Sequence, residues 1–196
     1  MIRSFYHKNF FGLPSKSIVF IALMLAIGLF FLAGSVASET ACTGISHWSE
    51  TSPPINQQHV FCGEWNSRKH RPAGFHSRPA GENPTTVGTL TVSQPPNAKG
   101  LYGVRWSYAG HPDRRKFSTM FPDTCNRDQV LNSIVYAVKH PRACPEGAPP
   151  WAKCGPNKPA QNGGHYCEAS DGSIFTIAFA TLRDSDKVNT AFPIAE

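Results

Sequence analysis

The order of apolar and polar residues along the chain predicts four strands. Residues 86–92 (TVGTLTV) and 100–108 (GLYGVRWSY) alternate in the way that is typical of strands. Residues 173–182 (SIFTIAFATL) are apolar almost throughout, which indicates a central strand. A turn at residues 184–187 (DSDK) leads to residues 188–194 (VNTAFPI), which we expect to return beside that strand as a hairpin.

One segment, DTCNRDQVLNSIVYAVKH, has the spacing of a helix. Its apolar residues recur at helical intervals: Val130, Leu131, Ile134, Val135 and Val138. Asp123 or Thr124 can cap its first turn by accepting hydrogen bonds from free N–H groups, and Pro141 ends it. The apolar stripe must be covered by other residues. We therefore expect an α+β fold in which a mainly antiparallel sheet packs against at least one helix.

The first 37 residues have the pattern of an export signal. Three cations (Arg3, Lys8 and Lys16) precede an apolar run at 17–33, and small residues follow at Ser35 and Ala37. We expect residues 1–37 to be a signal peptide, with a retained N-terminal membrane anchor as the alternative. The protein is therefore expected to be secreted or periplasmic, or anchored to the membrane if this segment stays. Cleavage lowers the formal net charge from +6 to +3, because the segment contains no acidic residue.

The exported part divides into two regions, and the second contains an insert. Residues 38–58 look like a polar lead-in, and residues 59–196 are expected to form the main domain. Within that domain, residues 141–172 are rich in Pro, Gly and Cys and predict a long insert held by disulfides.

The six cysteines all lie in the exported part: Cys42, Cys62, Cys125, Cys144, Cys154 and Cys167. An even count in an oxidising compartment favours disulfides, and six cysteines allow fifteen pairings. A structural zinc site is disfavoured, because no two cysteines have the C-x2-C spacing.

Two histidines stand out in the polar stretch HVFCGEWNSRKHRPAGFHSRP. His59 opens a short apolar segment, and His76 follows a glycine, which lets the backbone approach another group closely. Two imidazoles that face one phosphate can serve as base and acid, since both protonation states coexist near neutral pH. Spacing alone favours the alternative that both are solvated loop histidines.

Four motifs resemble the bacterial EndoU endoribonuclease family, which is related to uridylate-specific endoribonucleases. They are HVFCGEW (59–65), AGFHSRP (73–79), KFSTMFPDTC (116–125) and VNTAFPI (188–194). The resemblance implies an EndoU/RNase A-like fold, stapled by disulfides. Family members often carry tyrosine where this chain has Phe192, which keeps a stacking face but lacks the hydroxyl.

The resemblance also implies roles for particular residues. His59 and His76 become the acid/base pair, and Lys116 becomes the catalytic lysine, with Lys99 as its rival. The expected substrate-binding residues are Arg78, Ser118, Thr119, Thr190 and Phe192. Arg68, Lys69 and Arg71 are expected to face phosphate beside Arg78. Trp65, Trp106 and Trp151 are expected to be packing groups.

The implied reaction is attack of an RNA 2′-OH on the adjacent phosphate, leaving a 2′,3′-cyclic phosphate and a 5′-OH. This reaction requires no metal or other cofactor, and stimulation by manganese stays open. RNA is the expected partner, and a toxin or effector role with a cognate immunity protein is suggested by export. Two alternatives remain. One is a non-catalytic, disulfide-stapled binding protein, and the other is a zinc-dependent hydrolase that uses the two histidines.

Overall fold

A computed structural model describes residues 42–161 and 163–195 of the chain. The signal peptide or anchor predicted for residues 1–37 lies outside these residues. Two short helical turns, one long helix and eight strands follow in the order η1 (Gln58–Cys62), β1 (Glu64–Asn66), β2 (Arg71–Ala73), η2 (Pro79–Gly81), β3 (Val87–Gln94), β4 (Tyr102–Tyr108), β5 (Arg115–Met120), α2 (Arg127–Lys139), β6 (Lys153–Pro156), β7 (Thr176–Thr181) and β8 (Val188–Pro193).

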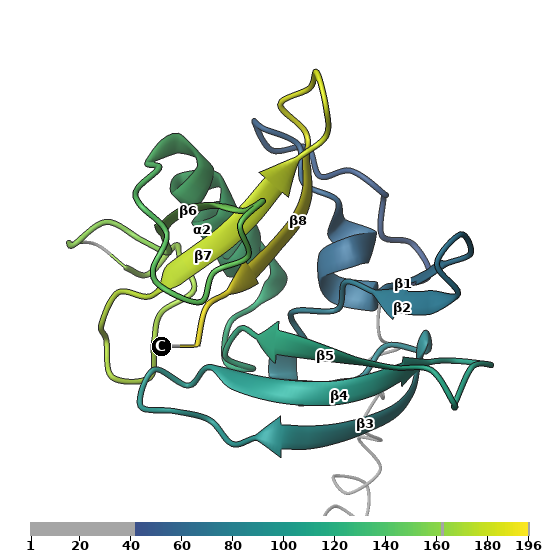
Figure 1. Cartoon of the computed structure of the whole chain (residues 1–196). Helices are drawn as coiled ribbons and strands as arrows, with labels where there is room; N and C mark the ends of the chain where they lie inside the picture. Colours follow the sequence, from purple (N-terminus) through teal and green to yellow (C-terminus); the bar gives the residue numbers. More distant parts are fainter. Residues whose placement is uncertain (1–41, 162, 196) are drawn as a thin grey trace, which may run out of the picture. The chain divides into compact units, whose positions relative to one another are not determined.

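The described strands form three antiparallel sheets, in the orders β1-β2, β3-β4-β5 and β6-β7-β8 (Figure 1). The predicted α+β class with antiparallel pairing is confirmed, although the strands are divided among three sheets. The four predicted strands correspond to β3, β4, β7 and β8. The short strands β1 and β2 have no alternation that the sequence could reveal, and β2 contains Pro72.

Strand β4 is the centre of the lower sheet in Figure 1. Its Val104 and Trp106 are fully buried and pack with Phe75 and Met120 in one of two core clusters. The Trp106 indole N–H donates to Ser118 Oγ on β5 at 3.0 Å. This sheet therefore fixes the position of β5, whose residues lead into the candidate site.

Helix α2 packs on the β6-β7-β8 sheet, as its apolar stripe predicts. Val130 and Ile134 are fully buried in the larger core cluster, together with Ile177 and Phe179 of β7. The helix ends at Lys139, before the predicted stop at Pro141.

The cap of α2 differs from the prediction. The cap is Asn126, whose side chain accepts from Gln129 N–H in a capping box, and not Asp123 or Thr124. The Asp123 carboxylate instead accepts hydrogen bonds from Tyr102 and Arg78. A residue with tertiary partners is not free to cap a helix.

Three disulfides join Cys42 to Cys62, Cys125 to Cys167, and Cys144 to Cys154. Disulfides are typical of proteins in oxidising compartments such as the periplasm or the extracellular space. In the part of the chain that the structure describes, no helix is both long and apolar enough to cross a membrane.

The region predicted to be a polar lead-in is packed into the domain from residue 42 onward. Ile45 and Ile55 are buried in the main core, and the Asn56 N–H donates to the Val188 carbonyl at the start of β8. The packed domain therefore begins before His59.

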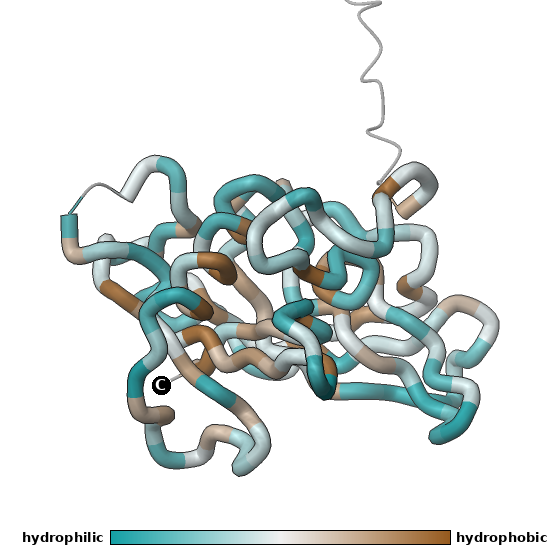
Figure 2. Tube along the Cα trace, turned by 90° about the horizontal axis from the view of Figure 1, so that it is seen from above, coloured by the Kyte–Doolittle hydropathy of each residue, from teal (hydrophilic) through white to brown (hydrophobic). Residues whose placement is uncertain are grey.

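Figure 2 shows hydrophilic residues (teal) mainly along the outer loops of the chain.

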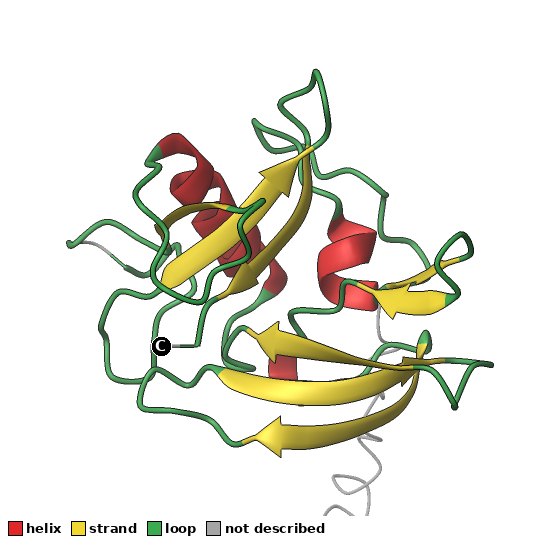
Figure 3. Cartoon of the chain, in the orientation of Figure 1, coloured by secondary structure: helices red, strands yellow, loops and turns green. Residues whose placement is uncertain are grey.

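The insert at residues 141–172 is mostly loop, drawn in green between α2 and β7 in Figure 3. It contains one strand that the sequence does not predict, β6, which pairs with β7. The pairing anchors one end of the Cys144–Cys154 loop to the sheet, and the Cys125–Cys167 disulfide anchors the far end of the insert to the start of α2.

Candidate active site

A cleft of about 600 Å³ lies among η1, β2, β5, β8 and the insert. Figure 1 shows β8 facing η1 and β5, with which it makes contact. The residues that line the cleft are His59, Arg71, Pro72, Ala73, Gly74, His76, Arg115, Lys116, Phe117, Ser118, Thr119, Trp151, Asn189, Thr190 and Phe192.

His59 is held on η1 by two contacts. Its backbone N–H donates to Asn56 Oδ1 at 3.0 Å, and its ring Nδ1–H donates to Glu64 Oε2 at 2.7 Å. Because a carboxylate only accepts, Nδ1 carries the proton, and Nε2 is the ring nitrogen available to a substrate. Partial burial raises the pKa of Glu64, but the hydrogen bonds from His59 and Asn56 outweigh it and lower that pKa below its ordinary value. Glu64 therefore stays a carboxylate beside the imidazole.

His76 is buried, with 5 % of its surface exposed. Its backbone N–H donates to the Val60 carbonyl at 2.7 Å, and its Nδ1–H donates to the Thr119 carbonyl at 2.9 Å. Burial, followed by the charges of Lys116 and His59, lowers the pKa of His76 well below the usual histidine value. His76 is therefore neutral at neutral pH, with Nε2 unprotonated.

The two histidines are brought together by Gly74. The rings of His59 and His76 lie 6.3 Å apart between centroids. Gly74 has a φ of +71°, and a Cβ at this position would lie 2.1 Å from the His59 carbonyl oxygen. The next residue, Phe75, donates its N–H to that oxygen at 2.7 Å. The two imidazoles can approach because residue 74 has no side chain.

Lys116 of β5 also lies in this cleft. Its ammonium donates to the Gly74 carbonyl at 3.1 Å and to Ser118 Oγ at 2.7 Å. Burial, and then the positive charge of Arg71, lowers the pKa of Lys116 to about 8. The rival candidate, Lys99, lies outside the cleft lining, in the turn between β3 and β4. The cleft thus holds two histidines and one lysine.

The expected substrate-binding residues Ser118, Thr119, Thr190 and Phe192 all line the cleft. Ser118 is 1 % exposed, and its hydroxyl donates to the Gly74 carbonyl at 3.0 Å while it accepts from Lys116 and Trp106. The bonds to Trp106 and Gly74 fix the Ser118 hydroxyl, which in turn orients the Lys116 ammonium. Phe192 stacks on His76 with 5.1 Å between ring centroids.

Arg78 is not part of the cleft lining. Its guanidinium pairs with Asp123 at 2.9 Å and donates from Nε to the Tyr102 hydroxyl at 2.7 Å. Burial lowers the pKa of Arg78, but the bonds and charges of Tyr102 and Asp123 outweigh it and raise that pKa above its ordinary value. The structure therefore does not bring Arg78 together with the other expected substrate-binding residues, which line the cleft.

The cations of the cleft differ from those expected. Arg71 lines it as predicted, whereas Arg68 and Lys69 lie outside the lining. Arg115, at the start of β5, lines the cleft although the motifs do not single it out. Its position beside Lys116 was the available signal, because it belongs to the same run of basic residues, DRRKF.

The position of Trp151 differs from the prediction. It was expected to be a packing group, but 57 % of its surface is exposed and it lines the cleft from the insert. The other two tryptophans do pack: Trp106 is fully buried, and Trp65 stacks on His111 with 3.6 Å between ring centroids.

Among residues 42–161 and 163–195, no group of three or more His, Cys, Asp or Glu side chains is placed to hold a metal ion. The lining of the cleft contains Arg71, Arg115 and Lys116 and no carboxylate. Glu64 is the carboxylate that contacts one of its two histidines.

An α+β domain that presents two histidines and a half-buried lysine in a basic cleft holds side chains able to transfer protons and to bind an anionic substrate. The model of the family described as bacterial EndoU nuclease matches residues 54–195. The chain therefore belongs to the bacterial EndoU nuclease family, and the resemblance seen in the four motifs is confirmed. No curated protein and no solved structure gives a match.

Proposed function

We propose that this protein is an exported endoribonuclease that cleaves single-stranded RNA by attack of a 2′-OH on the adjacent phosphate. The observation that carries the proposal is the convergence of His59, His76 and Lys116 on one cleft of a chain that belongs to a nuclease family. The products are a 2′,3′-cyclic phosphate and a 5′-OH end. DNA resists this reaction, because it lacks the 2′-OH.

His76 is the general base in this mechanism. Its burial and the neighbouring positive charges keep the ring neutral, and the bond from Nδ1–H to the Thr119 carbonyl directs the unprotonated Nε2 away from the backbone. A neutral imidazole can take the proton from the 2′-OH as the oxygen attacks phosphorus.

His59 is the general acid. When this ring is protonated, its contact with Glu64 is a salt bridge at 2.7 Å, and the remaining N–H at Nε2 can pass a proton to the leaving 5′-oxygen. The two histidines thus have different partners, a carbonyl for one and a carboxylate for the other. This difference supports their assignment to opposite steps of the proton transfer.

Lys116 stabilises the negative charge that develops on the phosphoryl oxygens. With a pKa of about 8 it remains largely protonated at neutral pH, and its bonds to Gly74 and Ser118 hold the ammonium in place beforehand. Arg71 and Arg115 add positive charge along the cleft and suit a phosphate backbone. The proposed steps use these side chains and no metal, and stimulation by manganese stays open.

The three disulfides and the apolar N-terminal run support export, and an exported ribonuclease is suited to act as a toxin or effector on other cells. A cognate immunity protein would then protect the producing cell.

The test is an incubation of the disulfide-bonded protein with uridine-containing RNA in EDTA, beside His59→Ala, His76→Ala and a His165→Ala control. His165 is an exposed histidine outside the cleft lining. We expect cyclic-phosphate ends from the wild type and the control and none from the other two. Cleavage that appears only with manganese would refute the metal-free mechanism. No cleavage under either condition by folded protein would leave the binding-protein alternative.

A further inference from the structure

Trp151 is the most exposed of the large hydrophobic residues in the described parts of the chain. At 57 % it exceeds Val92, Leu182 and Phe117. Trp151 belongs to neither of the two core clusters but lines the cleft, so its exposed indole lies where a bound ligand would meet it. The side chain is also amphipathic and rigid, which suits it to contact a ligand.

The insert holds Trp151 in place. The Cys144–Cys154 disulfide closes the loop at a sequence separation of 10, and the Arg142 N–H donates to the Cys154 carbonyl at 2.8 Å. Within the loop, the Ala152 N–H donates to the Pro149 carbonyl at 2.9 Å. A closed loop with a turn beside Trp151 reduces the conformational entropy that the side chain loses when it binds a ligand.

An aromatic series runs outward from the catalytic histidine to this tryptophan. Phe192 stacks on His76 at 5.1 Å, and Trp151 meets Phe192 edge to face at 6.0 Å and 63°. Because Trp151 and Phe192 touch each other at that angle, a base does not slide between them. The exposed part of the indole is therefore the surface that remains for a ligand.

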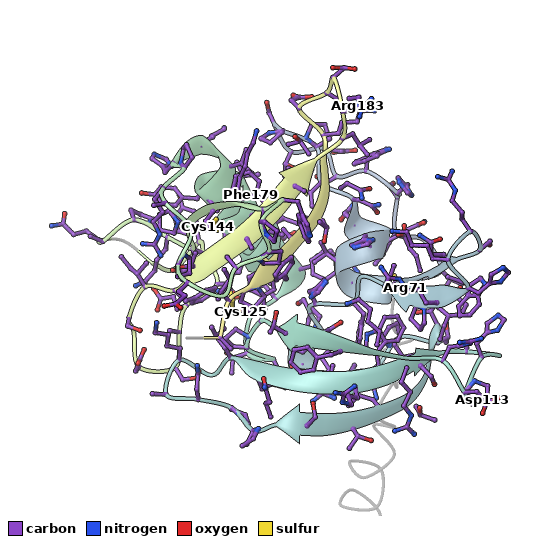
Figure 4. The ribbon with its side chains drawn as sticks, in the orientation of Figure 1. Arg71, Asp113, Cys125, Cys144, Phe179 and Arg183 are labelled. Carbon is purple, nitrogen blue, oxygen red and sulfur yellow. A yellow bond between two sulfur atoms is a disulfide. The ribbon has the colours of Figure 1, made fainter. Side chains whose placement is uncertain are left out.

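Cations line other parts of the same cleft. Arg71 and Lys116 lie on β2 and β5, whereas Trp151 comes from the insert and Phe192 from β8. Figure 4 labels Arg71 near β2 and Cys144 near β6, the strand that contains its disulfide partner Cys154. A groove that combines backbone-binding cations with aromatic faces fits single-stranded nucleic acid, in which the bases are free to stack on side chains.

We propose that Trp151 is the platform of a second nucleobase subsite, which stacks the base of a nucleotide next to the cleaved step of single-stranded RNA. The inference rests on the proposed function, since it takes RNA as the ligand of the cleft. The stacking is sequence-tolerant, because every base has a π face. Duplex RNA is excluded from this subsite, because its bases are paired and stacked on each other.

The test measures binding of the full disulfide-bonded protein to short RNAs with one 2′-deoxyuridine at the cleaved position, which bind but cannot react. Fluorescence anisotropy compares the wild type with Trp151→Leu, Trp151→Phe and a Leu182→Ala control, which shortens another exposed apolar side chain. Trp151→Leu should weaken binding roughly 5- to 150-fold, the range of one lost base–aromatic stack. Trp151→Phe should recover most of that loss, and Leu182→Ala should bind as the wild type does.

A second arm replaces the nucleotides beside the cleaved step, one at a time, with abasic ones. At the position that Trp151 contacts, the abasic RNA should bind wild type and Trp151→Leu equally. The inference is overturned if Trp151→Leu binds like the wild type, or if its loss persists with every abasic RNA. It is also overturned if the wild type binds no RNA. Binding without cleavage of all-ribose RNA would refute the proposed function and leave the subsite standing.

Discussion

The replacement of Gly74 by alanine tests how the two histidines are brought together. A Cβ at this position would lie 2.1 Å from the His59 carbonyl oxygen and 2.9 Å from its ring Cγ, whereas ordinary contact begins near 3.4 Å. The obstacle is backbone, so it cannot rotate away. His59 must move by about 1 Å, and a displacement of that size costs roughly 10²-fold in rate.

The same substitution also affects stability. Alanine at a φ of +71° costs about 1–2 kcal/mol. Loss of the hydrogen bond from Phe75 N–H to the His59 carbonyl adds about 1 kcal/mol. The Gly74 carbonyl also accepts from Lys116 and Ser118, so a shift of this residue disturbs the lysine as well. We expect Gly74→Ala to lose about 2–4 kcal/mol of unfolding free energy and nearly all cleavage.

Gly110→Ala is the matched control. Its φ is +81°, but a Cβ at this position meets nothing within 4 Å, so it has the backbone strain without the clash. Urea denaturation and single-turnover cleavage of RNA are measured for both variants. We expect Gly110→Ala to lose about 1–2 kcal/mol of unfolding free energy and to cleave RNA as the wild type does. Equal stability losses in the two variants, with full cleavage by Gly74→Ala, would refute the account of the close approach.

Three further predictions concern the charged groups. The cleavage rate should fall as pH rises through about 8, because Lys116 acts while protonated, and Arg71→Ala should move this fall to higher pH. A pH–rate profile that Arg71→Ala leaves unchanged would contradict the assigned pKa. Glu64→Gln should lower kcat roughly tenfold with little change in KM, since a neutral acceptor keeps about half of a charge-assisted bond. A larger effect on KM would instead indicate that Glu64 binds substrate. Asp123→Asn should cost about 1–3 kcal/mol in urea denaturation and leave cleavage intact. A loss of cleavage would mean that the Arg78–Asp123 pair is needed for activity as well as for stability.

Most of the regular fold could be predicted from local patterns. The four strands with alternating or continuous apolar residues and the one amphipathic helix correspond to β3, β4, β7, β8 and α2. The strands that were missed have short or weakly patterned sequences, such as β6, which forms because β7 offers it an edge. The cap at Asn126 was missed because Asp123 is engaged with Arg78 and Tyr102.

The candidate site, like the fold, could be predicted from the sequence only in part. The motifs place His59, His76 and Lys116 in order along the chain, and the structure describes all three as lining one cleft. The even number of cysteines indicates disulfides, but not that Cys144 pairs with Cys154 to present Trp151. Pairing depends on which segments meet in the folded domain, and no spacing along the chain contains that information.

The sequence by itself determined the fold class, the family and the types of residue available for catalysis, because periodicity and short motifs are local properties. Only the tertiary structure decided which cations enter the cleft. Arg78 and Arg115 each lie within two residues of a predicted catalytic residue along the chain, yet one is paired with Asp123 and the other lines the site. The physical reason is that a side chain's charge, burial and direction depend on partners from distant parts of the chain.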